Sequence, residues 1–146
     1  MRQMLTVLIL TLGCAGQAEM AAAQDAPQLP DLKGRWVGTG ESVVMGNPLH
    51  HGGDAASQDK PRLSAVEFTY TIKGQDGRRF WGTSTSQRNT EPIIGVIGFD
   101  GKTLTMQDSD GTIEGTIVDT DTIEFIYSHS TDESMVICTN RLKRQS

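Results

Sequence analysis

The chain has 146 residues, with 13 Lys and Arg against 18 Asp and Glu, and its formal net charge is −5 at pH 7. This acidity, with no basic run to interrupt it, excludes a surface that binds nucleic-acid phosphates. About 120 residues follow the N-terminal leader described next, a length that suits one domain with one core.

Residues 1–23 have the pattern of a secretory signal peptide. Arg2 supplies a short positive region, residues 5–12 are apolar, and small residues at 21–23 suit a signal peptidase. We expect cleavage after Ala23, which leaves Gln24 as the first mature residue and places the protein in the periplasm or outside the cell. No later apolar stretch is long enough to be a transmembrane segment.

The two cysteines bear on anchoring and on covalent stability. A lipid anchor at Cys14 is the alternative to cleavage after Ala23, but Thr11 stands where a lipoprotein signal has a large aliphatic residue. With the leader removed, Cys138 is the only cysteine, so no internal disulfide can form. The predicted domain is therefore stabilised by packing alone.

From Leu32 onward the sequence predicts β-strands almost throughout, without a convincing helical period. Glycine and aspartate at 74–77, 100–101, 108–111 and 119–121 indicate tight turns. Eight short strands at this spacing predict an all-β fold, an eight-stranded antiparallel up-and-down β-barrel over residues 34–146 with 24–33 as a linker. The expected strands are 35–45, 64–73, 78–87, 92–99, 102–107, 111–118, 121–129 and 134–143.

Alternation of apolar and polar residues predicts which side chains face the barrel interior. An eight-stranded barrel is either filled by these side chains or holds one small ligand. His129 continues the inward face at the end of its strand, where it either contacts a ligand or bonds a backbone carbonyl. The residues expected to line a pocket are Val66, Phe68, Tyr70, Phe125, Tyr127 and His129.

The segment 92–99, PIIGVIGF, is apolar on both faces. Ile93 and Ile97 face opposite to Ile94 and Val96. A strand that is apolar on both faces is covered on both faces. The cover is either the N-terminal segment or a second subunit, and we favour a homodimer through 92–99.

The first expected strand opens with Gly34, Trp36, Gly38 and Gly40 at alternate positions. This spacing resembles the Gly-x-Trp signature of calycin barrels, which include lipocalins, fatty-acid-binding proteins and avidins. The resemblance implies that Trp36 closes the barrel floor and that a basic residue of the last strand, here Arg141, packs across it. The chain is most similar to small exported bacterial barrels, and that resemblance implies no activity.

Two relatives of this group suggest cofactors that the sequence does not support. The glycine spacing also resembles nitrobindin-like haem barrels, but no C-terminal histidine stands in the setting that haem ligation needs. The chain has two tryptophans, whereas avidin-type biotin pockets use several. We therefore expect no organic cofactor.

Residues 46–62 form a long connection between the first two expected strands, and such connections are often lids or binding loops. They contain His50, His51 and Asp54. Neighbouring histidines in an extended chain point to opposite sides, but a turn at the glycines that follow could bring them together, with His129 as a third imidazole. The alternatives are a metal site and a polar loop, and the polar loop is favoured.

Motifs of catalysis are lacking. No Gly-x-Ser-x-Gly elbow or phosphate-binding loop occurs, and Asp108, Asp110 and Glu114 fail the spacing of a calcium-binding hand. We therefore expect a non-enzymatic, exported barrel that binds a small apolar or amphipathic ligand. The alternatives are a periplasmic interaction or envelope scaffold that acts through its surface, and a metal-binding protein that uses the 50–54 loop.

Overall fold

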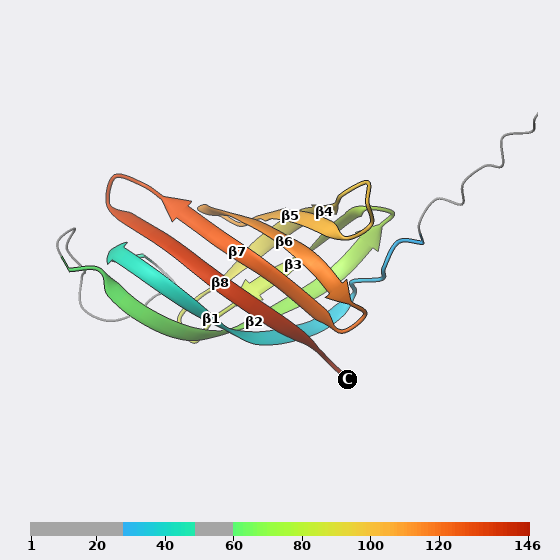
Figure 1. The fold of residues 1–146 in the computed structure, drawn as a ribbon, viewed down its shortest axis with the longest axis horizontal. Helices are drawn as coiled ribbons and strands as arrows, with labels where there is room; N and C mark the ends of the chain where they lie inside the picture. The colour runs from blue at the N-terminus through green and yellow to red at the C-terminus, as the bar shows by residue number, and fades with distance from the viewer. Residues whose placement is uncertain (1–27, 49–59) are drawn as a thin grey trace, which may run out of the picture.

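The computed structural model describes residues 28–48 and 60–146, and it is an all-β closed barrel (Figure 1). Each strand pairs antiparallel with its neighbour in sequence, and the last strand pairs with the first. The predicted up-and-down topology is confirmed. The strands are β1 (Gly34–Gly46), β2 (Arg62–Asp76), β3 (Arg79–Thr85), β4 (Thr90–Ile97), β5 (Thr103–Gln107), β6 (Gly111–Asp119), β7 (Thr122–Ser130) and β8 (Ser134–Gln145). Within the described ranges, no helix could cross a membrane.

The predicted turns form by local hydrogen bonds. Gly77 and Gly101 have φ angles of 57° and 71°, which glycine adopts without steric cost. Asp100 accepts bonds from the backbone nitrogens of Lys102 and Thr103 at 2.8 and 2.9 Å, and so fixes the turn between β4 and β5. Because these bonds join residues within three positions of one another, the turns could be predicted from the sequence.

The barrel has two different ends. At one, which we call the floor end, the N-terminal segment 28–33, the start of β1 and the end of β8 lie together (right in Figure 1). The opposite end, the open end, gathers the connections β1–β2, β3–β4, β5–β6 and β7–β8. The β1–β2 connection contains the predicted lid, and its residues 49–59 lie outside the described part of the chain.

Trp36 is completely buried at the floor end, as the calycin resemblance implies. Its Nε1 donates to the carbonyl of Leu32 at 2.9 Å. Leu32 is buried and its nitrogen donates to Gln75 Oε1 at 2.7 Å, so the described part of the expected linker packs against the barrel. The floor is therefore closed by the N-terminal segment together with Trp36.

The basic residue over Trp36 is Arg144 and not the expected Arg141. The Arg144 guanidinium carbon lies 4.1 Å from the centre of the Trp36 ring, a cation–π contact. Arg141 lies on the outer face of β8 and pairs with Glu124 at 2.6 Å. The reason is strand alternation, because Leu142 is buried and residues 142 and 144 share a face that residue 141 does not.

Strand β4 has two apolar faces, as predicted. Ile93 and Ile97 point inward and are buried. Ile94 and Val96 point outward and remain 64% and 50% exposed. The N-terminal residues 28–33 lie at the floor end and do not cover this outer face, so within the described chain the face is uncovered.

Candidate functional site

The inward residues predicted to line a pocket pack against one another. Phe68, Tyr70 and Phe125 are buried, while Val66 and Tyr127 are half-buried. The Tyr70 and Phe125 rings meet edge to face with centroids 5.3 Å apart. Strand alternation therefore places these side chains on the predicted face, and their contacts make a core.

Two cavities inside the described barrel each measure about 10 Å³. One is lined by apolar side chains near Trp36. The other has polar walls that include Tyr70, Ser84, Asp108 and Asn140. Such a volume has room for about one water molecule and not for an organic ligand.

Asn140 contributes an unpaired polar atom to the polar cavity. Its side chain is buried and its Nδ2 donates to Cys138 Sγ at 3.2 Å. Its Oδ1 has no hydrogen-bond partner among the described residues. Since a buried polar atom is costly to leave unsatisfied, a single water between Asn140 and the other polar walls would stabilise this interior.

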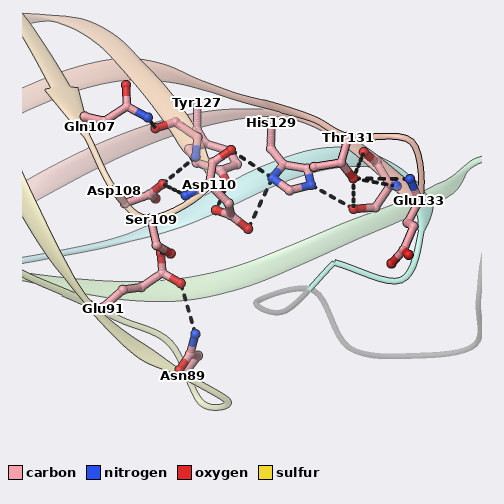
Figure 2. A network of polar contacts seen from close by, with 12 residues as sticks. Asn89, Glu91, Gln107, Asp108, Ser109, Asp110, Tyr127, His129, Thr131 and Glu133 are labelled. Atoms are coloured by element: carbon pink, nitrogen blue, oxygen red, sulfur yellow. Dashed lines mark hydrogen bonds and ion pairs between the residues drawn. The ribbon is translucent and has the colours of Figure 1, made fainter.

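His129 lies at the open end, as predicted, and its side chain is buried in a polar network (Figure 2). Its Nδ1 is 3.2 Å from the backbone oxygen of Asp110 and 3.2 Å from Asp110 Oδ2. Its Nε2 is 2.7 Å from Ser134 Oγ. Both ring nitrogens thus have protein partners. One partner is a backbone carbonyl, as in the interpretation of His129 that has it bond to the backbone and not to a ligand.

Three carboxylates gather beside His129. Glu91, Asp108 and Asp110 each place an oxygen within 4.8 Å of the others. The sequence had drawn attention to Asp108 and Asp110 but grouped them with Glu114, which lies on the outer face of β6. The missed member is Glu91, and its signal was alternation, because it shares the inward face of β4 with Ile93.

Protein donors already hold most of these carboxylate oxygens. Asn89 and Ser109 bond the two oxygens of Glu91 at 3.0 and 2.9 Å. The hydroxyl of Tyr127 donates to Asp110 Oδ1 at 3.0 Å, and the Gly111 nitrogen donates to Asp108 Oδ1 at 2.6 Å (Figure 2). The network therefore ties together the β3–β4, β5–β6 and β7–β8 connections at the open end.

Burial and mutual repulsion raise two pKa values in this network. Burial raises the pKa of Asp108, and the charges of Glu91 and Asp110 add to the effect, against bonds from the Gly111 and Asp110 nitrogens. Burial likewise raises the pKa of Tyr127, with a further contribution from the neighbouring aspartates. The tyrosine is therefore a neutral hydrogen-bond donor at neutral pH.

The proposed metal ligands His50, His51 and Asp54 lie outside the described residues.

An apolar concavity lies on the outer face of β3, β4 and β5. This groove has a volume of about 660 Å³, with Ile94, Val96 and Trp81 among its lining residues. Trp81 is 49% exposed and stands directly opposite Ile94 in the sheet. An ion pair between Arg79 and Asp76 borders the groove.

A second outer groove, of about 650 Å³, crosses β1 and β6–β8 near the open end. Its apolar lining includes Val43, Met45 and Ile137. It also includes Asp110 and His129 of the polar network, and Pro61, which lies two residues after the undescribed segment 49–59. Every residue that lines the groove over β3–β5 lies far in sequence from that segment, so this groove is the better-defined concavity.

Comparison of the chain with protein-family models, with curated proteins and with solved structures gives no match.

Proposed function

We propose that this protein is an exported, non-enzymatic binding protein that acts through the outer surface of a filled barrel. The observation that carries the proposal is the contrast between interior and exterior. Cavities of about 10 Å³ leave no room for an organic ligand inside the described barrel, whereas the outer groove measures about 660 Å³. Exposed Trp81 supports this, since tryptophan is enriched among residues that dominate binding energy.

The proposal is tested by photocrosslinking in the producing cell. A benzoylphenylalanine residue replaces Ile94 in the groove or Ile126 on the outer face of β7, which is similarly exposed. We expect a discrete covalent product from position 94 and none from position 126. No product at 94, or the same products at both positions, would contradict a binding role for this groove.

A second candidate function is the binding of a small apolar or amphipathic ligand in the same groove. The volume of about 660 Å³ favours it, because it falls within the range of ligand sites, about 300–1,000 Å³. Native mass spectrometry of the protein purified without detergent separates the cases. If the wild-type protein carries an organic ligand that the Ile94→Lys variant lacks, the ligand binds in the groove. If instead the Phe68→Ala variant lacks it, the ligand binds inside the barrel.

The calycin-like kinship and the export of the chain belong to the same proposal. Trp36 beneath a basic residue of the last strand supports the kinship. The signal pattern of residues 1–23 supports export. N-terminal sequencing of the mature protein is expected to begin at Gln24, and a lipid on Cys14 would overturn this part of the proposal.

A further inference from the structure

The outer face of β3 and β4 carries three large apolar side chains that lie next to one another. Trp81 stands opposite Ile94, and Val96 is the next outward residue of β4 after Ile94. We call these three residues the β3–β4 strip. Each is about half exposed or more, and large contiguous apolar patches mark interaction sites.

The described part of the N-terminal segment leaves this strip exposed. Residues 28–33 are held at the floor end by Gln75 and Trp36. Within the described residues nothing covers the strip, so its apolar side chains are available to a partner molecule.

The barrel topology limits how that partner binds. Every strand has a neighbour on both sides, so the sheet offers no edge strand to which an extended peptide could add as a further strand. The partner must instead place side chains against the face of β3 and β4. A second rigid barrel presents such a face, with an apolar centre and a polar rim of the kind found in protein interfaces.

The charges around the strip are self-complementary. Asp76 and Arg79 both border the groove, and both are largely exposed. In a twofold interface the same patch faces itself, so a patch of one sign would repel its copy. Here Arg79 and Asp76 pair with each other within one chain, so the patch carries both signs and can meet its own copy without like-charge repulsion, although the whole chain carries a net charge of −5.

We propose that the β3–β4 strip packs against the same strip of a second copy of this chain in a twofold-symmetric dimer. The inference rests on the proposed function, because it identifies a second copy of the chain as the molecule that binds the outer groove. Standard interfaces bury about 800 Å² per partner. The strip supplies the apolar centre of such an interface, and Asp76, Arg79, Thr105 and Gln107 supply its rim.

Sedimentation velocity of the mature protein over a range of concentrations tests the dimer. We expect a monomer–dimer equilibrium that Ile94→Lys weakens on the order of 100-fold, because two lysines would be buried across the twofold axis. Ile126→Lys is the matched control and should leave the equilibrium unchanged. A wild-type chain that stays monomeric at all concentrations would overturn the inference.

A charge exchange tests the symmetry. Arg79→Asp and Asp76→Arg each give the rim a single sign, so each variant alone should dimerise on the order of 10-fold more weakly. An equimolar mixture of the two should recover most of the wild-type affinity, because opposite patches then meet. Far-ultraviolet circular dichroism checks that both variants fold, and a mixture no stronger than its components would overturn the twofold pairing.

The crosslink from position 94 separates this inference from the proposed function. A product of twice the chain mass supports both. A product of any other mass leaves the groove as a binding surface but overturns the dimer. The lack of any product overturns both.

Discussion

Arg144 joins three segments at the floor end. Its Nη1 and Nη2 donate to the carbonyls of Lys33 and Asp31 at 2.8 and 2.7 Å, and its Nε donates to the carbonyl of Thr120 at 3.0 Å. The same guanidinium lies over Trp36. One side chain therefore connects the N-terminal segment, the β6–β7 turn and the last strand.

Loss of this side chain should destabilise the fold measurably. We expect Arg144→Ala to lower the free energy of unfolding by about 2 kcal/mol, from the lost cation–π contact and charged hydrogen bonds. Arg141→Ala is the matched control, because its exposed pair with Glu124 contributes at most about 1 kcal/mol. Urea unfolding measures both, and equal losses would contradict the assignment of Arg144 to the floor.

Asp108 gives the open end a pH dependence whose sign follows from its raised pKa. The folded state binds this proton more tightly than the unfolded state, so the stabilisation it gives at low pH is lost as pH rises through the folded pKa. Asp108→Asn keeps an oxygen for the Gly111 and Asp110 nitrogens and stays neutral. We expect the variant to be more stable than wild type at pH 7, with the difference disappearing in acid.

Asp119 provides a control of opposite sign. Its pKa is lowered, chiefly by the bond from the Asp121 nitrogen, so its contribution is present at neutral pH and is lost as pH falls. Asp119→Asn should therefore be less stable than wild type at pH 7 and equal to it in acid. Thermal unfolding across pH 3–8 measures both variants, and the same sign for the two would refute the account of Asp108.

At the scale of single elements, strand alternation decides most of what each residue does. In β7, Phe125 is buried and 4% exposed, while its neighbour Ile126 is 56% exposed. Both are large and apolar, so composition alone does not separate them. Their consequences for stability nevertheless differ, because only one contributes to the core.

Substitutions in β7 test this difference. We expect Phe125→Ala to cost about 3–5 kcal/mol through lost burial and a residual cavity. Ile126→Ala should stay within about 0.5 kcal/mol. If Phe125→Ala does not fold, Phe125→Leu provides a smaller step in the same direction, and a comparable cost for the two positions in urea unfolding would contradict the register of β7.

Strand alternation could also have identified from the sequence which basic residue of β8 lies over Trp36. Val136, Cys138, Asn140 and Leu142 are buried at every second position of β8. Extending that parity reaches residue 144, so the floor arginine was available from pattern alone. The mistaken choice of Arg141 followed the motif resemblance instead of the strand period.

At the scale of the whole molecule, closure of the sheet determines where binding can occur. Inward side chains from all eight strands meet in a space that leaves cavities of about 10 Å³. The polar end of that space is occupied by the network around His129 and Glu91 (Figure 2). We therefore propose that binding occurs at the outer faces, of which the β3–β5 groove is the better defined.

The sequence by itself determined the strands, the turns and the inward and outward faces, because each depends on residues a few positions apart. It therefore predicted the barrel, the rim position of His129 and both faces of β4, whereas the place of Trp36 followed from the calycin resemblance. Only the tertiary structure decided that Glu91 joins Asp108 and Asp110, since those residues come from separate connections that closure brings together. It also decided that the described interior is filled, because the free volume of a core depends on how side chains from every strand interlock.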